Sequence, residues 1–133
     1  MLEIRYEWNQ HGMKQWMSGI QCLSKIGKEL LFDIQGSSLT IRCLNDSHSV
    51  SGELHWSSSG MTCHMPMALS DELLQFKIYI KMIQFLFKHM KHMNTMIMKI
   101  MLHETSLEVV ELKFEFTCEF DIIKVSKETC YMT

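Results

Sequence analysis

Two stretches of this chain repeat their apolar residues with the period of an α-helix, while most other apolar residues alternate with the period of a β-strand. Along Gln10–Ile26, apolar residues recur every three or four positions and form one stripe. Lys81–Met93 has the same period, with Phe85 as the exception on its polar side. Asn9 is a typical N-cap, and Gly27 lies where a helix C′ residue is expected. The sequence therefore predicts two helices inside a chain of strands.

The predicted strands surround these two helices. They are Leu2–Trp8, Leu30–Ile34, Leu39–Leu44, Val50–Trp56, Phe76–Ile80, Met96–Leu102, Leu107–Phe116 and Cys118–Val125. Met61–Leu69 is ambiguous, because Pro66 argues against a central strand. The order indicates a β-α-β-β-β unit that is repeated, with the second copy starting near Leu73. Consecutive antiparallel strands with both helices on one face of the sheet make an α+β fold.

Composition limits the class of protein. With 133 residues and 47% hydrophobic content, the chain is expected to form one globular domain, or a tight pair of similar units, rather than a disordered segment. The N-terminus has no apolar signal region, and no apolar run approaches the roughly 20 residues of a membrane span. The five cysteines are scattered without a C-x-x-C pair, which favours reduced intracellular thiols. We interpret the 13 methionines as core filler, with a Met-rich binding groove as the alternative.

Charge is distributed unevenly along the chain. The two predicted helices contain no Asp or Glu and hold 5 of the 13 basic residues. The remaining 8 basic residues stand against all 15 acidic ones, which gives the rest of the chain a net charge of −7. Helices that carry only positive charge in a nearly neutral protein are typical of a domain that faces a polyanion.

Three segments resemble one known family. Cys22–Leu30 resembles the L-S-R-I-G-x-E-L segment of the Rad-nine subunit of the nine-one-one checkpoint clamp, a DNA sliding clamp. Leu39–Ser49 resembles the L-x-L-R-x-x-N-S-S-R-S segment of the same family, with His48 where the family has Arg. Leu74–Phe87 resembles its strand-then-helix element, and Ser57–Gly60 replaces an aromatic-rich stretch. These motifs are patterns of strands and turns, and they carry no catalytic signature.

The resemblance implies a fold and a role. In a clamp domain the helices line the hole and the antiparallel sheets form the outer shell. We expect an N-terminal clamp-type domain at residues 1–126 and a frayed tail at 127–133, with the family's second clamp domain, connecting loop and disordered tail absent. The implied function is that of a nuclear scaffold subunit in DNA-damage checkpoint signalling and repair. Its implied partners are the two other clamp subunits and double-stranded DNA, bound weakly through its backbone.

The expected DNA contacts lie on the two helices. Our candidates are Lys14, Lys25, Lys81, Lys88 and Lys91, with Gln21, Gln84 and His92 as neutral helpers. Long lysine side chains can reach phosphates without reading bases. The alternative is that these residues form ordinary solvated helix faces.

The resemblance also implies that the last strand pairs with a neighbouring clamp subunit. The residues of this interface strand are Cys118, Glu119, Phe120, Asp121, Ile122, Ile123, Lys124 and Val125. An exposed strand edge is a natural pairing site. The alternative is an edge that is covered by the chain's own tail.

Catalysis and metal binding have little support in the sequence. His89 and His92 lie three residues apart, and Cys63 is next to His64, but neither pair completes a tetrahedral zinc set. The family carries an exonuclease attribution, yet the candidate carboxylates lie on separate strands and turns without a spacing that predicts convergence. These carboxylates are Glu3, Asp33, Asp46, Asp71 and Glu72. We therefore expect no enzyme, metal or cofactor. A generic protein-interaction domain that pairs through a sheet edge, without a DNA role, remains the alternative function.

Overall fold

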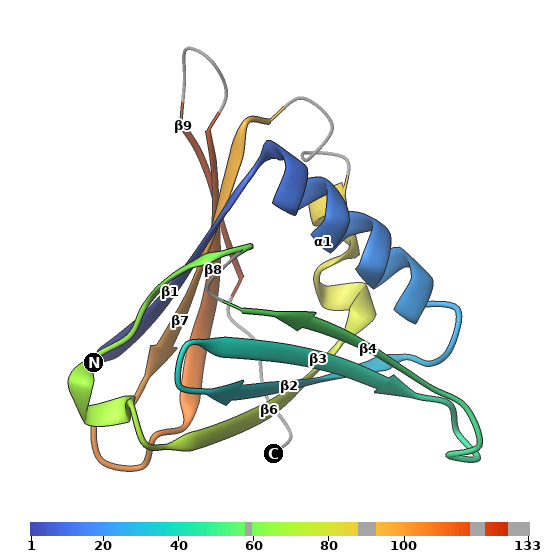
Figure 1. Ribbon diagram of the computed structural model, residues 1–133, viewed down its shortest axis with the longest axis horizontal. Helices are drawn as coiled ribbons and strands as arrows, with labels where there is room; N and C mark the ends of the chain where they lie inside the picture. Colours follow the sequence, from blue (N-terminus) through green and yellow to red (C-terminus); the bar gives the residue numbers. More distant parts are fainter. Residues whose placement is uncertain (58–59, 88–92, 118–121, 128–133) are drawn as a thin grey trace.

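Over the residues that it describes, the computed structural model of the chain is an α+β fold with one complete α-helix and two antiparallel sheets (Figure 1). It describes the backbone of residues 1–57, 60–87, 93–117 and 122–127, and the side chains of all of these except 122–127. The helix is α1 (Gln10–Leu23). The strands are β1 (Leu2–Asn9), β2 (Glu29–Gln35), β3 (Ser38–Leu44), β4 (Ser51–Trp56), β5 (Thr62–His64), β6 (Leu73–Tyr79), β7 (Thr95–Leu102), β8 (Val109–Thr117) and β9 (Ile122–Lys127). Three short 3-10 segments complete the order: η1 (Met67–Leu69), η2 (Ile80–Met82) and η3 (Gln84–Leu86).

The two sheets divide the strands between them. One sheet has the order β5-β1-β7-β8-β9, and the other has the order β4-β3-β2-β6. All their pairings are antiparallel. In Figure 1 the sheets lie at a steep angle to each other, and α1 runs across the open side between them. One face of each sheet and one side of α1 therefore enclose a common core.

Aromatic side chains fill the centre of this core. Trp8 on β1 is 1% exposed, and its ring centroid lies 6.4 Å from that of Trp16 on α1 and 5.8 Å from that of Trp56 on β4. The ring of Phe114 on β8 lies 6.0 Å from Trp16. This cluster joins the helix to strands of both sheets. Burial in the same core raises the pKa of the Tyr6 phenol.

Glycines let α1 and the segment after it approach the four-stranded sheet closely. A Cβ added at Gly19 would lie 2.5 Å from Leu54 Cδ1, and one added at Gly52 would lie 2.6 Å from Ile26 Cδ1. Real Cβ atoms do not approach other atoms so closely, and therefore a larger residue at either position would force the ends of these side chains to shift. The helix consequently packs directly on β4.

The end of α1 differs from the prediction. The helix ends at Leu23 with Ser24 as its C-cap, instead of continuing to Ile26. Bonds from an N–H to the carbonyl three residues earlier tighten the following turn, including Ile26 N to Leu23 O at 2.9 Å. Gly27 is not a left-handed C′ residue, because Gly36 is the one described glycine with positive φ (56°). It is required instead because a Cβ would lie 2.2 Å from the Leu44 carbonyl oxygen.

The second predicted helix, Lys81–Met93, is wrong from Lys81 to Leu86, whereas Phe87 is α-helical. Residues 80–86 form η2 and η3 instead of an α-helix, with bonds from Ile83 N to Ile80 O and from Leu86 N to Ile83 O, both 3.0 Å long. The three buried residues of this segment, Ile80, Ile83 and Leu86, are spaced by three, which suits three residues per turn. Residues 88–92 of the predicted helix lie outside the described residues.

The strand predictions are confirmed in their order. Seven of the eight predicted strands correspond to β1–β4 and β6–β8, with ends that differ by up to three residues. The eighth, Cys118–Val125, overlaps β9, and its first four residues lie outside the described part. The ambiguous stretch Met61–Leu69 contains the short strand β5 and the turn η1. The second group of elements begins with β6 at Leu73, as the expected repeat requires.

Candidate nucleic-acid interface

The exposed side of α1 carries no acidic residue. Lys14 and Lys25 are exposed near its two ends, and the residues between them on the same side are uncharged. These exposed residues are Gln15, Ser18, Gln21 and Cys22. Lys14 lies near the beginning of α1 and Lys25 in the turn that follows its last residue, so the two are separated by most of the length of the helix. They are suited to two separate points on an extended polyanion.

Local sequence and packing fix which side of α1 is exposed. The Asn9 Oδ1 atom accepts a hydrogen bond of 2.9 Å from Gly12 N and caps the first turn. Met13, Trp16 and Ile20 are fully buried on the opposite side of the helix. Because these residues fix the rotation of the helix, Lys14 must point to solvent.

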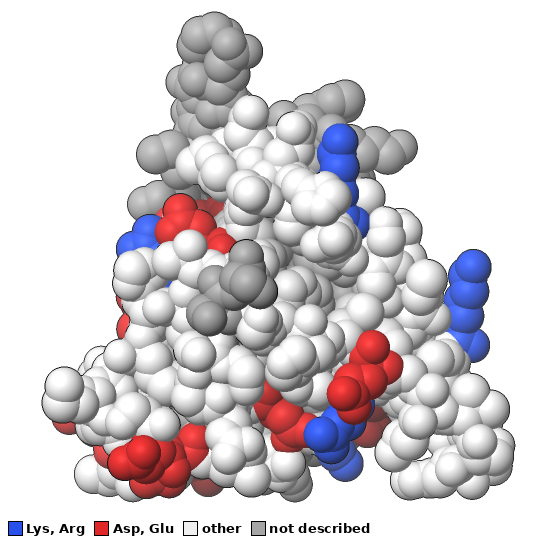
Figure 2. All heavy atoms as spheres, in the orientation of Figure 1, with Lys and Arg blue, Asp and Glu red and all other residues white. Residues whose placement is uncertain are grey.

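Acidic residues lie on the sheet faces that are turned away from the core. On β4, the strand under α1, Leu54 faces the helix, whereas Glu53 lies on the opposite face and pairs with Arg42. Other carboxylates occupy the outward faces: Glu3, Glu7, Glu111 and Glu115 on the five-stranded sheet, and Glu29 and Asp33 on the four-stranded sheet. In Figure 2 the surface over α1 shows isolated blue atoms and no red ones, whereas red atoms gather near the sheets. The acid-free surface therefore belongs to the helix.

The remaining candidate lysines are placed only in part. Lys81 is exposed on η2, and Gln84 is exposed on η3. Lys88, Lys91 and the proposed helper His92 lie outside the described residues. Of the five candidates, the structure thus places Lys14, Lys25 and Lys81 at the surface, and a role in DNA contact stays a prediction for all five.

The candidate interface strand forms one end of the five-stranded sheet. Residues Ile122, Ile123, Lys124 and Val125 belong to β9, which pairs with β8 from Thr117↔Ile122 to Leu112↔Lys127. Residues Cys118, Glu119, Phe120 and Asp121 lie outside the described residues. Because β9 is the last strand in the sheet order, its backbone has one side that is not bonded to β8. Pairing of that side with another subunit stays a prediction.

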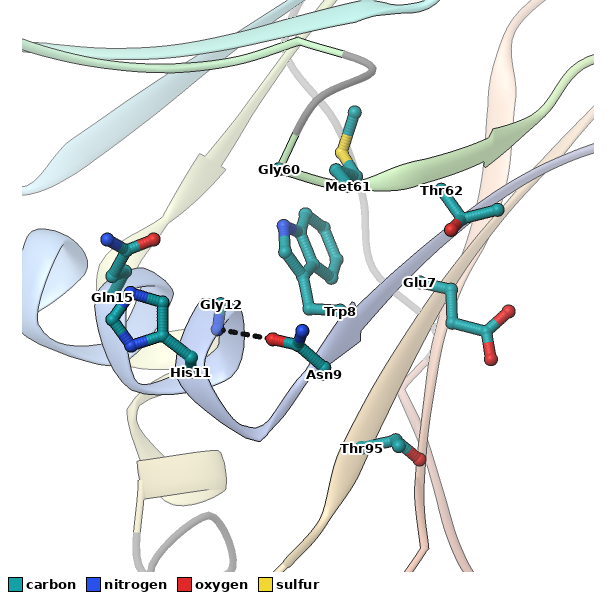
Figure 3. A pocket seen from close by; sticks show the side chains of 10 residues that line it. All are labelled: Glu7, Trp8, Asn9, His11, Gly12, Gln15, Gly60, Met61, Thr62 and Thr95. Atoms are coloured by element: carbon teal, nitrogen blue, oxygen red, sulfur yellow. Dashed lines mark hydrogen bonds between the residues drawn. The ribbon is translucent and has the colours of Figure 1, made fainter.

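A cavity lies at the beginning of α1. It has a volume of about 410 Å³ and lies between the first turn of the helix and the segment around β5 (Figure 3). Trp8, His11, Gln15 and Met61 are among the residues that line it. The Trp8 indole nitrogen is buried and has no hydrogen-bond partner among the described residues. His11 and Gln15 place further hydrogen-bonding groups beside the Lys14 end of the acid-free surface.

The candidate carboxylates of a nuclease site do not converge among the described residues. Glu3 lies on β1 and Asp33 on β2, in different sheets. The described residues contain no group of three or more His, Cys, Asp or Glu side chains that could hold a metal ion. Asp33 is held by Arg42 Nη1 at 3.1 Å and accepts a bond from Gln75 Nε2, so it has a structural role on the sheet face.

Comparison with known proteins bears on the function of this surface. A protein-family model described as Rad9 matches residues 17–132. The chain belongs to the Rad9 family. This confirms the resemblance found in the sequence. A search of curated proteins gives no match.

The Rad9-like segments have structural roles in this fold. The first of them, Cys22–Leu30, forms the end of α1, the close turn at Gly27 and the start of β2. In the second, Leu39–Ser49, Asn45 organises the turn after β3: its Oδ1 atom accepts bonds from Ser49 N at 2.8 Å and Val50 N at 3.0 Å. The Rad9-like segments therefore supply the connection from α1 to β2 and the turn from β3 to β4. Among the described residues, no helix has the length and apolar character needed to cross a membrane.

Proposed function

We propose that this chain is a subunit of a nuclear checkpoint sliding clamp and that it turns α1 toward the DNA. The observation that carries this proposal is the acid-free exposed side of α1 in a chain that belongs to the Rad9 family. The subunit acts as a scaffold in DNA-damage signalling and repair and has no catalytic role.

The contacts with DNA are made to phosphates. Lys14, Lys25 and Lys81 reach the backbone through long flexible stems, and Lys88 and Lys91, which lie outside the described residues, are proposed as further contacts. Such contacts carry no sequence information, which suits a protein that must slide on any duplex. Each neutralised phosphate adds a modest, salt-sensitive increment, so the single chain binds weakly and the ring provides retention.

Assembly uses the edge of the five-stranded sheet. The strand β9 pairs with a strand of a neighbouring clamp subunit through backbone hydrogen bonds. This arrangement extends the sheet across the subunit boundary and places α1 on the inner side of the ring.

The first test of this function is assembly. We expect the chain to co-elute with the two other checkpoint-clamp subunits in size-exclusion chromatography after co-expression. The matched variants are Ile123→Pro and Lys124→Pro, because neighbouring residues of an antiparallel strand alternate in the direction of their N–H groups. One variant removes an N–H that points away from β8 and should abolish co-elution while the circular dichroism spectrum is kept. A chain that elutes alone, or two variants that both co-elute, would show that β9 is not the interface.

The second test is DNA binding by the full chain. The double variant with Lys14→Glu and Lys25→Glu should bind a fluorescent 30-base-pair duplex at least about 10-fold more weakly at 50 mM salt, because two phosphate contacts are replaced by repulsion. The slope of log affinity against log salt should fall by about 1.8 for two contacts. Fluorescence anisotropy measures both quantities.

The control for this test is Lys77→Glu, on the outward face of the four-stranded sheet. It makes the same change in net charge as either single substitution on α1. Equal losses of affinity for Lys77→Glu and for Lys14→Glu would mean that only net charge matters, and the role of α1 would be refuted.

A further inference from the structure

A groove lies on the outward face of the four-stranded sheet, on the side away from α1. Its volume is about 570 Å³, which falls within the range of sites that hold small ligands or peptide side chains. The residues around it come from β2, β3, β4, β6 and the turn between β3 and β4. It has no part in the proposed DNA contacts.

The floor of the groove is apolar. Leu31 on β2 is half-buried there, and Leu44 and Tyr79 are 46% and 45% exposed. Val50, which is 53% exposed, lies in the turn beside it. Half of the exposed large hydrophobic residues of the described chain are therefore in or next to this groove. Large exposed apolar residues that cluster in a depression are typical of a protein-binding site.

The charges of the groove are arranged unequally across the sheet. In the cross-strand row, Leu31 has Lys77 on one side and Arg42 on the other. Arg42 is neutralised by Asp33 at 3.1 Å and Glu53 at 3.2 Å. Lys77 has no ion-pair partner within the described part of the chain. The β6 side of the floor therefore presents a cation without a counter-charge.

The other charged residues do not remove this asymmetry. Glu29 lies opposite Tyr79 on β2 and is next to Lys28 in the sequence, so their charges offset each other at that end. Asp46 lies in the turn on the far side of the groove. The wall on that side is well fixed, since Asn45 Nδ2 donates to Ser49 Oγ at 3.0 Å in addition to the backbone bonds that the Asn45 side chain accepts. The groove is thus an apolar floor with positive charge toward β6 and negative charge toward β4.

We infer that this groove binds a segment of a partner protein in which an aliphatic or aromatic side chain is flanked by Asp or Glu. The apolar side chain packs on Leu31, Leu44 and Tyr79, and the neighbouring carboxylate pairs with Lys77. Arg42 is not available for such a pairing, because its charge is already paired with Asp33 and Glu53 within the sheet. The partner docks on the face opposite α1, and its binding is independent of DNA.

Four fluorescein-labelled octapeptides test this inference against the full chain by anisotropy. Each carries one anchor, Leu or Phe, with an Asp pair before or after it, and Gly-Ser elsewhere. We expect at least one to bind, and its Lys-for-Asp counterpart to bind about 5-fold or more weakly. Lys77→Glu should reverse this preference, and Leu44→Ser should weaken binding by about 10-fold, since it removes apolar contact area.

Two matched variants serve as controls. Met67→Ser removes an apolar side chain that is 90% exposed outside the groove, and Lys14→Glu changes charge on the opposite face. Both should leave peptide binding unchanged, and Lys77→Glu should leave DNA binding unchanged. Failure of the DNA proposal and failure of this one therefore give different results.

Several results would overturn the inference. These are dissociation constants above 1 mM for all four peptides, a charge preference that survives Lys77→Glu, or equal losses for Met67→Ser and Leu44→Ser. A dimer of the chain that forms at high concentration and is lost in Leu44→Ser would make a second copy the occupant, and would also overturn it.

Discussion

Replacing Trp16 with alanine is expected to lower the free energy of unfolding by about 3–5 kcal/mol. Trp16 is fully buried, and its ring lies between those of Trp8 and Phe114. Its removal leaves a large cavity where α1 meets strands of the five-stranded sheet, and the rigid neighbouring rings cannot collapse into it. A domain typically has about 5–15 kcal/mol of stability, so the variant should lose a large share of it. Urea denaturation followed by circular dichroism measures the difference.

Two variants on the same helix make this expectation specific. Trp16→Phe keeps most of the volume and should cost clearly less than Trp16→Ala. Gln21→Ala changes an exposed residue and should stay within about 0.5 kcal/mol of the original chain. If Trp16→Ala cost less than 1 kcal/mol, α1 would not be packed on this aromatic cluster.

Replacing Gly27 with alanine is expected to cost about 2–3 kcal/mol. The added Cβ would lie 2.2 Å from the Leu44 carbonyl oxygen and 3.0 Å from Cys43 Sγ. A backbone atom of a central strand cannot move away as the end of a flexible side chain can. The turn between α1 and β2 must therefore shift, and the apolar contacts of Ile26 and Leu23 with Gly52 shift with it. Thermal unfolding of the full chain measures the loss.

Gly60 provides the matched control for this prediction. A Cβ at Gly60 would meet no atom of the described residues within 4 Å, so Gly60→Ala should be nearly neutral. If Gly60→Ala lowered the stability as much as Gly27→Ala, the effect would come from helix or turn propensity in general. A neutral Gly27→Ala would contradict the close approach of this turn to β3.

The strands could be predicted from the sequence because one face of each is buried and the other is not. In β1, Ile4, Tyr6 and Trp8 are at most 1% exposed and alternate with charged residues, so the period of two is visible without a structure. The elements that depend on contacts distant in sequence were less predictable. The role of Gly27 is an example, because it follows from the position of Leu44, 17 residues later in the chain.

The second helix shows the limit of periodicity. Apolar residues spaced by three or four suit an α-helix, yet a run spaced only by three also suits a 3-10 segment. Phe85 gave the available signal: it fell on the polar side of the predicted helix, and in the structure it is half-buried against the core. An apolar residue on the polar side thus indicated that an α-helical period was the wrong prediction for this part of the chain.

The candidate sites were predictable to different degrees. The acid-free side of α1 could be read from the sequence, because it depends only on which residues a helix contains. The groove on the four-stranded sheet could not, since it requires the register that places Leu31 between Lys77 and Arg42. Residues 31, 42 and 77 come together only when three strands are paired.

The arrangement of carboxylates on the outward sheet faces gives the domain a directional response to any polyanion. Nucleic acid that approaches the outside of either sheet meets carboxylates interspersed with basic residues, some of them ion-paired, whereas along α1 it meets lysines without any carboxylate. A small net charge for the whole domain therefore hides a difference between its sides, since, among the described residues, only the side of α1 is free of acidic residues. Raising the salt concentration would screen these charges. The difference between the two sides in their interaction with a polyanion would then be lost at salt concentrations that leave the domain folded.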